Sequence, residues 1–270
     1  MLLFIVLLLQ TQLFSFTHKN FQQIYNKIEQ RLNPTLTLLI IADKKKILYI
    51  GGDKKEQFVR IGDIKLNIIY EQYAINFLYE PGKVLFPLLV ADNGDDTYRY
   101  FSSNKKIALY AKYFSSEKLQ RFFDHFRFNR AAIYKDAIGK RPYIPNFARN
   151  RIFQKQVAAL GYGLLVTPMH MLQAYMQAVK EHKNLQKFML NNAKEYYNIF
   201  DRDIGLVGTI ARRAVKEKYS NNFVLSYYGF INKNDKRFFI ALITQFSAPT
   251  NNVNSKNFVS FFTDIVDRLE

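Results

Sequence analysis

The sequence predicts an α+β fold in which an antiparallel β-sheet is flanked by helices. Three segments in the last third of the chain, 204–211, 223–231 and 238–246, are rich in β-branched and aromatic residues and are typical of strands. Two further apolar runs, 35–42 and 47–50, predict a β-hairpin near the N-terminus. Because the order is helix, hairpin, helical middle, three strands and helix, the first and last strands could share one antiparallel sheet.

Helices are predicted at both ends of the chain. Apolar residues at helical spacing in 17–34 predict a short lead-in helix, which the Asn-Pro pair at 33–34 stops. The C-terminal segment has the same periodicity. We expect its face with Phe258, Phe262 and Ile265 to pack on the sheet.

The middle of the chain predicts a helical lobe. Helical faces are expected over 107–114 and 119–126, and the serine pair 115–116 is placed to cap the second. Residues 127–160 are expected to be irregular. Thr167-Pro168 opens a stronger helix, because Thr can cap and Pro loses no needed hydrogen bond at the first helical position.

Turn residues divide these elements. Gly51-Gly52 is expected to end the second strand, and a polar stretch with no assigned element follows to about Asn76. Further turns are predicted at 93–96 and, between the last two strands, at 232–235.

The composition indicates a folded, strongly basic protein. Of 270 residues, 49% are hydrophobic and 23% are charged, so wholesale disorder is not expected. The chain has no Cys, which rules out disulfides and thiolate metal sites. A net charge of +17 favours binding to nucleic acid, anionic lipid or acidic wall polymers. The lysines are spread along the chain, which is also typical of an ordinary solvated surface.

The N-terminus begins with an apolar run. Met1 to Leu9 is unbroken and 13–16 continues it, which is too short to span a bilayer comfortably but fits a signal sequence. No Lys or Arg precedes the run, and no clear cleavage site follows it. His18 and Lys19 directly follow the run. An anchor whose following chain lies outside the membrane would instead have its positive residues before the run. A cleaved signal, a retained anchor and a buried terminal helix therefore all stay open.

Six segments of the chain form an ordered set of motifs. They are Tyr79-Glu80-Pro81-Gly82, Phe101-Ser102-Ser103-Asn104, Phe126-Arg127-Phe128-Asn129, Gly161 to Pro168, Ile204 to Thr209, and Tyr227 to Phe230 with a strand ending at Ala248-Pro249. Taken in order, they resemble the transpeptidase domain of penicillin-binding proteins over about 35–270. The first looks like the turn before the family's Ser-x-x-Lys, the second like its Ser-x-Asn motif, and the fifth like its Lys-Thr-Gly strand. The fourth is the most specific match.

The resemblance implies a trimmed penicillin-binding or β-lactamase-like fold. It divides the chain into 1–16, a signal sequence or membrane anchor, 17–34, the helical lead-in, and 35–270, a transpeptidase-like domain. The spacings between the motif segments are shorter than the family's, so segments that wall the substrate groove are expected to be trimmed. The large N-terminal region of high-mass relatives has no counterpart in the residues before the first strand.

The first motif has lost the residues that carry its chemistry. In the family, a Ser at a helix N-terminus attacks an acyl carbon, and a Lys one turn later shuttles the proton. Lys83 stands at the serine position and Phe86 at the lysine position. No Ser lies between Phe16 and Ser102, so a small shift in alignment restores no nucleophile. Nothing in the neighbouring sequence predicts a lowered pKa for Lys83.

The other two motifs are partly kept. Ser102 and Asn104 could donate hydrogen bonds into a cleft, although a turn and helix cap would use the same residues. The family's Lys and Thr, which bind the substrate carboxylate and the serine network, are replaced in the strand motif, while its Gly and Thr remain. The vestigial cleft implied by the resemblance consists of Lys83, Phe86, Ser102, Asn104, Leu206, Val207, Gly208 and Thr209.

We therefore expect a catalytically inactive relative of the D,D-transpeptidases. It would be exported, act in the periplasm or at the outer face of the cytoplasmic membrane, and bind cell-wall synthesis proteins or peptidoglycan as a scaffolding partner. One alternative is residual transpeptidase or penicillin-binding activity, with Ser102 as the only plausible hydroxyl. The other is a basic exported module that binds an anionic polymer or a membrane surface. Neither a cofactor nor a metal is expected, since the four histidines at 18, 125, 170 and 182 have no metal-ligand spacing.

Overall fold

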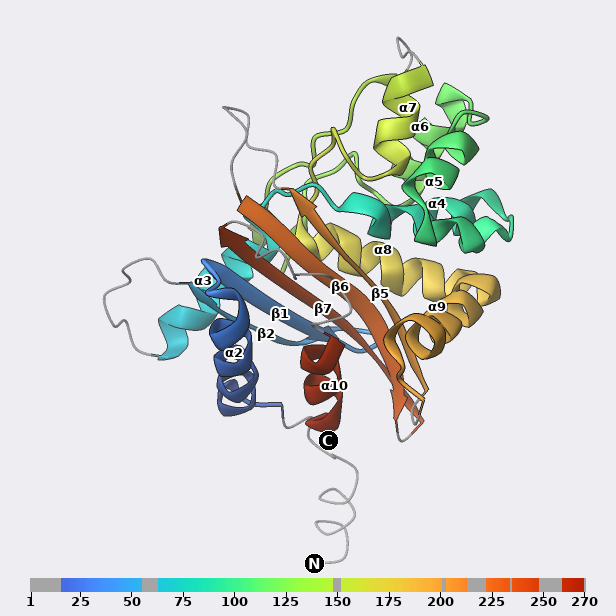
Figure 1. Ribbon diagram of the computed structural model, residues 1–270. Helices are drawn as coiled ribbons and strands as arrows, with labels where there is room; N and C mark the ends of the chain where they lie inside the picture. Colours follow the sequence, from blue (N-terminus) through green and yellow to red (C-terminus); the bar gives the residue numbers. More distant parts are fainter. Residues whose placement is uncertain are drawn as a thin grey trace, which may run out of the picture.

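A computed structural model describes residues 16–54, 63–147, 152–200, 203–212, 222–233, 235–247 and 259–269 (Figure 1). It confirms the α+β class. One five-stranded antiparallel sheet lies between a layer formed by the two terminal helices and a larger helical lobe.

The sheet has the strand order β2-β1-β7-β6-β5. The first strand, β1, and the last, β7, share this sheet, as the sequence predicts, and they pair directly and antiparallel. Lys233 pairs with Lys236, so the β6–β7 turn falls within the predicted 232–235. The bounds are β1 Leu36–Ala42, β2 Ile47–Lys54, β5 Ile204–Arg212, β6 Asn222–Lys233 and β7 Lys236–Ser247.

The prediction that Gly51-Gly52 ends the second strand is wrong. Both glycines lie inside β2 and pair with β1. A Cβ at Gly52 would lie 2.8 Å from the ring of Tyr70, so the strand needs glycine where the next helix packs on it. The glycines here allow a close approach and do not mark a turn.

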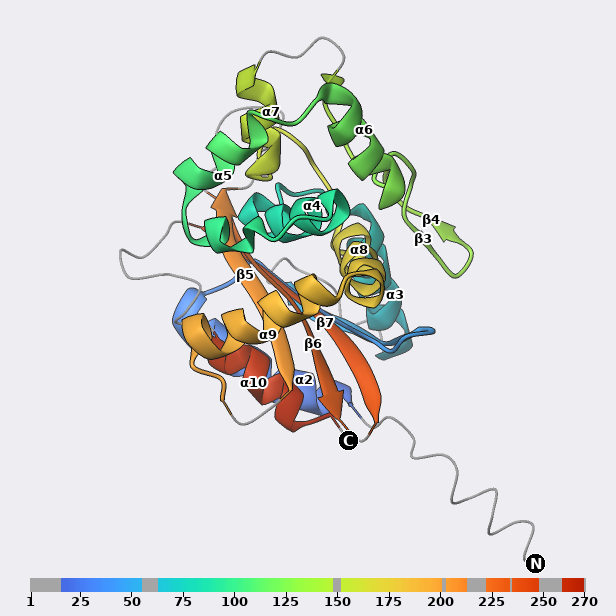
Figure 2. The ribbon, with the colours of Figure 1, turned by 90° about the vertical axis from the view of Figure 1, so that its right-hand side faces the viewer.

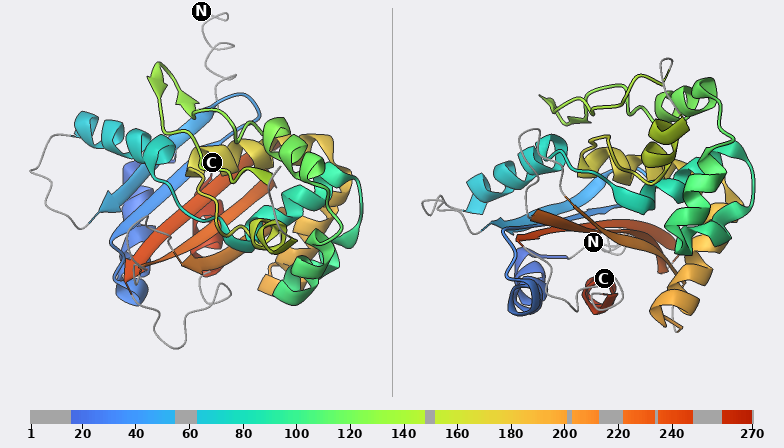
Figure 3. Two further views of the ribbon diagram at one scale, coloured as in Figure 1. Left: turned by 90° about the horizontal axis from the view of Figure 1, so that it is seen from above. Right: turned by 45° about the horizontal axis from the view of Figure 1, so that its top comes forward.

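The two terminal helices cover one face of the sheet (Figure 3). They are α2 His18–Leu32 and α10 Val259–Asp267. Phe262 and Ile265 are fully buried in the core below the sheet, as predicted, whereas Phe258 lies outside the described residues. Lys27 Nζ lies 2.6 Å from Asp264 Oδ2 and links the two helices at the surface.

The helical lobe covers the other face (Figure 2). Its long helix α8 runs under the lobe and contacts β6 and β7. A short hairpin, β3 Ile133–Tyr134 and β4 Ala137–Ile138, projects beside it. The helices are α3 Asp63–Asn76, η1 Gly82–Leu85, α4 Phe86–Asn93, η2 Thr97–Ser102, α5 Asn104–Ala111, α6 Ser116–His125, α7 Ile152–Ala159, α8 Pro168–Glu181 and α9 Lys183–Tyr197.

Two segments expected to lack regular structure are helical. The polar stretch before Asn76 forms α3, whose buried Tyr70, Ala74 and Ile75 belong to the core of the lobe. The irregular 127–160 contains α7, which buries Ala158 and Ala159. In both cases tertiary packing of a few small or aromatic residues stabilises a helix whose periodicity is weak in the sequence.

The predicted helix caps are present. Ser115 Oγ accepts a hydrogen bond from Lys118 N at 3.1 Å at the start of α6. Thr167 Oγ1 accepts one from His170 N at 3.4 Å at the start of α8. Within the described residues, no helix is both long enough and apolar enough to cross a membrane.

Candidate functional site

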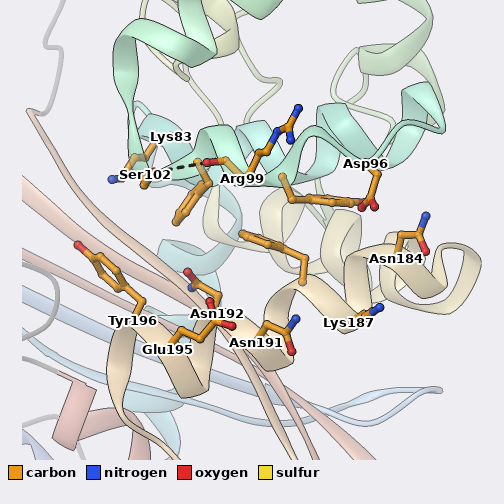
Figure 4. Close-up of a pocket in the computed structure, with 13 residues that line it drawn as sticks. Lys83, Asp96, Arg99, Ser102, Asn184, Lys187, Asn191, Asn192, Glu195 and Tyr196 are labelled. Atoms are coloured by element: carbon orange, nitrogen blue, oxygen red, sulfur yellow. Dashed lines mark hydrogen bonds between the residues drawn. The ribbon is translucent and has the colours of Figure 1, made fainter.

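The candidate site is a groove between η2 and α9, with a volume of about 650 Å³ (Figure 4). One wall is a single face of α9, on which the lining positions recur every three to four residues. They are Asn184, Lys187, Phe188, Asn191, Asn192 and Glu195. The facing wall is η2, and Lys83 and Ser102 both line the groove.

Helix α9 orients its polar face because its other face is apolar. Leu185, Met189 and Ala193 are fully buried and are spaced four residues apart, and Tyr197 follows after another four. The sequence predicted no element over the residues of α9, so this wall of the groove was not predicted. The four-residue spacing of these core residues was the signal that could have found it.

Lys83 is half-buried at the end of the groove. Its Nζ lies 5.0 Å from the ring centroid of Phe101, a cation–π distance. Burial lowers the pKa of the Lys83 amine below its ordinary value. The sequence did not predict this lowered pKa. The residues of η2 that bury Lys83 come later in the chain and pack against it only in the folded protein.

A close contact between two glycines positions Lys83. Gly82 has φ +62° and its N donates to Gly161 O at 3.1 Å, while Gly161 has φ +72°. A Cβ on Gly161 would lie 2.0 Å from Gly82 O, and one on Gly82 would lie 3.1 Å from Thr209. A residue with a Cβ fits at neither position of this glycine contact. The turn 79–82 is therefore held in place between the 161–168 segment and β5.

Two further contacts hold the same pair of segments together. Tyr79 and Val166 form an isolated antiparallel bridge. Glu80 Oε1 accepts a hydrogen bond from Gly163 N at 2.8 Å. Burial raises the pKa of Glu80, and this hydrogen bond partly opposes the rise. The two segments that most resemble the family in sequence therefore pack directly on each other.

Phe86 belongs to the core and not to the groove. It is fully buried and meets Tyr110 edge-on, with ring centroids 5.5 Å apart. Nearby, Tyr175 Oη donates to Val84 O at 2.5 Å. Phe86 therefore forms a hydrophobic contact between α4 and α5.

The Ser-x-Asn segment is mainly a helix start. Ser102 is exposed in the groove and donates to Arg99 O at 3.4 Å. Ser103 caps α5 by accepting from Lys106 N at 3.4 Å. Asn104 is exposed outside the groove lining, so of this motif only Ser102 faces the site.

The strand motif on β5 also lies outside the groove lining. Leu206 and Val207 are fully buried, on opposite faces of the sheet. The edge of β5 is covered by α9, because Asn192 Nδ2 donates to Leu206 O at 2.6 Å and Tyr197 Oη donates to Gly208 O at 3.3 Å. Of the eight residues predicted for the vestigial cleft, the structure brings only Lys83 and Ser102 together in the groove.

The groove is suited to polar binding. Its lining has three cations, Lys83, Arg99 and Lys187, and two carboxylates, Asp96 and Glu195. Asn184, Asn191 and Asn192 add amides, which can both donate and accept hydrogen bonds. Among the described residues, no cluster of His, Cys, Asp and Glu could hold a metal ion.

His170 lies beneath the lobe, away from the groove lining. Its Nε2 lies 3.0 Å from Arg130 O and its Nδ1 lies 2.7 Å from Thr167 Oγ1. Burial lowers the pKa of His170, which the contact with Arg130 O partly opposes. These contacts indicate a structural histidine of the core.

Comparisons with known proteins find similarity in structure only. No family model matches the sequence, and no curated protein matches it. The structure is similar to the TP domain of penicillin-binding protein 3 from Burkholderia pseudomallei, with a TM-score of 0.71, 12% identity and 95% of each chain covered.

Two further solved structures are similar. A peptidoglycan glycosyltransferase from Burkholderia ambifaria has a TM-score of 0.70 and 12% identity, with 94% of this chain and 96% of that chain covered. A peptidoglycan synthetase from Bifidobacterium adolescentis also has a TM-score of 0.70 and 12% identity. The match covers 91% of this chain but only 59% of the synthetase. The fold predicted from six weak motifs is confirmed: this chain has the fold of penicillin-binding protein transpeptidase domains.

Proposed function

We propose that the chain is a non-catalytic relative of the transpeptidases that binds peptidoglycan or a cell-wall synthesis protein outside the cytoplasmic membrane. One observation carries the proposal. At the position that corresponds to the nucleophile, Lys83 faces the groove, and at the position of the proton carrier, Phe86 is buried against Tyr110. The place of the site is kept while its chemistry is replaced.

Acyl transfer by this fold needs three groups acting as a unit. It needs a hydroxyl nucleophile, a proton carrier and an anchor for the substrate carboxylate, and loss of one removes most of the rate. Lys83, Phe86 and Leu206 replace all three. On α9, the side chain of Asn192 donates a hydrogen bond to the backbone carbonyl of Leu206 at the edge of β5. Without this hydrogen bond, the carbonyl would be free to accept one from an extended substrate.

The groove itself supports binding of an extended polar ligand. Asn184 and Glu195 are eleven residues apart on α9, which places the ends of the polar face about 16 Å apart. Three amides and one charge of each sign, Lys187 and Glu195, lie along this face and can pair with the amide and carboxylate groups of a wall peptide. The buried hydroxyl of Tyr98, in the facing wall, has no hydrogen-bond partner among the described residues.

The test is binding to soluble peptidoglycan fragments, measured by calorimetry. Lys187→Trp fills the groove, whereas Lys112→Trp places the same side chain at the exposed end of α5 and removes the same charge. We expect the wild type and Lys112→Trp to bind alike and Lys187→Trp to bind at least about tenfold more weakly. Equal binding by both variants would place the ligand elsewhere, and no binding by the wild type would reject the peptidoglycan proposal.

A second candidate, residual acyl transfer, is favoured by one observation. Ser102 and Lys83 both line the groove (Figure 4), and an amine with a lowered pKa can activate a hydroxyl that it reaches. Labelling by a fluorescent penicillin that is abolished by Ser102→Ala would favour this candidate. Absence of labelling in the wild type would leave the binding proposal.

A further inference from the structure

A second pocket, with a volume of about 560 Å³, lies between η2 and α5. Its lining combines three tyrosines, Tyr100, Tyr110 and Tyr113, with two cations, Arg99 and Lys106, and none of the described residues that line it has a carboxylate. Only Arg99 also lines the groove, and its side chain extends from η2 away from α9 (Figure 4). The tyrosine pocket is therefore a site of its own beside the groove.

One of the three tyrosines presents a free ring. Tyr113 is 83% exposed, and Leu109, four residues earlier and in the same lining, is 51% exposed. The backbone of Tyr113 is fixed, because its N donates to Tyr110 O at 3.2 Å and the next residue, Phe114, is buried with its ring 4.9 Å from that of Tyr110. The Tyr113 ring and Leu109 are thus held at the surface and form a small apolar platform.

The other two tyrosines are already packed against neighbours. The Tyr110 ring meets Phe86 and Tyr100 edge-on, with centroids 5.5 and 6.2 Å away. The guanidinium of Arg99 lies 5.5 Å from the ring centroid of Tyr100. The pocket therefore offers one free ring as a platform, whereas sites for single-stranded nucleic acid stack successive bases on several aromatic side chains.

The charge that the pocket presents is positive. The carboxylate of Asp95 accepts hydrogen bonds from Tyr110 Oη, from Thr97 Oγ1 at 2.6 Å and from Thr97 N at 3.0 Å, so it is already engaged. Helix α5 has two lysines, Lys105 and Lys106, and no acidic residue. An anionic group is therefore attracted to the pocket, and a cationic one is repelled.

We propose that the tyrosine pocket binds an acidic saccharide, in which a sugar ring carries a carboxylate group. The C–H face of a sugar ring can lie on the Tyr113 platform, and its hydroxyls can form hydrogen bonds with the polar groups of the lining. The guanidinium of Arg99 matches the geometry of a carboxylate, and Lys106 adds a second positive charge from α5. A neutral sugar would leave the two cations unused, and an anion without a ring would leave the platform unused. The inference does not depend on the proposed function of the groove.

The test is calorimetry of the full chain with three probes that differ in one feature each. Tetragalacturonate has sugar rings and carboxylates, its methyl ester has the rings without the charges, and tetraglutamate has the charges without the rings. We expect tetragalacturonate to bind, and each of the other two probes to bind at least about tenfold more weakly, because each loses one of the two kinds of contact.

Two pairs of variants locate the binding. Tyr113→Ala should weaken binding of tetragalacturonate by about fivefold to tenfold, whereas Tyr143→Ala removes another exposed tyrosine, outside the pocket lining, and should have no effect. Lys106→Gln should weaken binding by roughly threefold to fivefold, whereas Lys112→Gln removes an exposed charge just after α5, outside the lining, and should have no effect. All four side chains are exposed, so the variants should fold like the wild type.

Four results overturn the proposal. Absence of tetragalacturonate binding rejects the acidic saccharide. Equal binding of tetraglutamate means that charge alone attracts the ligand. Equal losses in Lys106→Gln and Lys112→Gln mean that the attraction comes from the whole basic surface and not from the pocket. Tighter binding of a thymidine tetranucleotide that is lost in Tyr113→Ala assigns the pocket to nucleic acid.

Discussion

The glycine contact and the groove lining lie next to each other and are constrained in opposite ways. At the glycine contact, the backbones of Gly82 and Gly161 touch, with no room for a Cβ. In the groove, exposed polar side chains of α9 and η2 face open space. The backbone beside Lys83 is thus fixed by close contacts, whereas the groove that Lys83 lines is not.

The segment 126–129 shows a related constraint at a residue other than glycine. Arg127 there has φ +58°. A non-glycine residue in this left-handed conformation is strained, whereas glycine adopts it freely. The buried Phe126 and Phe128 on either side hold this backbone path by their packing.

The largest effect should come from the glycine contact. Gly161→Ala should lower the free energy of unfolding by about 3 kcal/mol or more, from the left-handed backbone and the clash with Gly82 O. Gly94→Ala is the matched control, because Gly94 has φ +71° but no atom within 4 Å of a Cβ. It should lose only about 1–2 kcal/mol. Urea unfolding measures both, and equal losses would show that the contact adds nothing.

Restoring the lost lysine should be nearly as harmful. Phe86→Lys would bury an unpaired ammonium group against Tyr110, at a cost of about 3–5 kcal/mol. Lys83→Ser, which restores the other half of the motif at the groove, should change stability by less than about 1 kcal/mol. Two variants of similar stability would mean that position 86 can open into the groove, and this would sharpen the case for residual activity.

A smaller effect should appear on acidification. The pKa of His170 is lowered in the folded state, so below its ordinary value of 6.5 the unfolded chain binds a proton that the folded chain does not. Stability from this group should therefore fall as the pH falls through and below 6.5. His170→Gln should flatten that part of the stability profile, followed by thermal unfolding across the pH range. An unchanged profile would exclude His170 as its cause.

The smallest effect should come from Lys83. Its pKa is lowered by burial, so the folded state disfavours the charged amine below the ordinary value of 10.5. Lys83→Met should raise stability at neutral pH by less than about 1 kcal/mol, because the amine still reaches solvent. The gain should shrink as the pH rises toward 10.5, where the folded wild type loses its proton first. A gain that is constant with pH would mean better packing by Met and not relief of the charge.

The sequence predicted the sheet because its strands have strong local signals. The runs 35–42 and 238–246 are apolar and continuous, and the order of elements predicted that they share one sheet. Their direct pairing is seen only in the structure. Gly51-Gly52 looked like a strand end, because the sequence does not show that Tyr70 would pack over Gly52. The helix α3 was missed for the same reason, since only its packing on the lobe core reveals it.

The candidate site was predicted less completely than the fold. Position 83 was found because a turn with its own sequence pattern precedes it. The wall on α9 was not, because Asn184, Lys187 and Asn191 form a polar stripe of the kind that any solvated helix has. That this stripe faces η2 depends on long-range packing. Leu206 was placed in the cleft by motif position, yet it lies on the opposite face of the sheet from Val207.

The most direct test of the central claim is the intact mass of the wild-type protein after long incubation with a penicillin. The claim is that Lys83 and the buried Phe86 leave the site without acyl-transfer chemistry. We predict a mass unchanged from that of the untreated protein. A stable increase by the mass of one penicillin, absent in Ser102→Ala or in Lys83→Ala, would contradict the claim and identify the residue that carries the adduct.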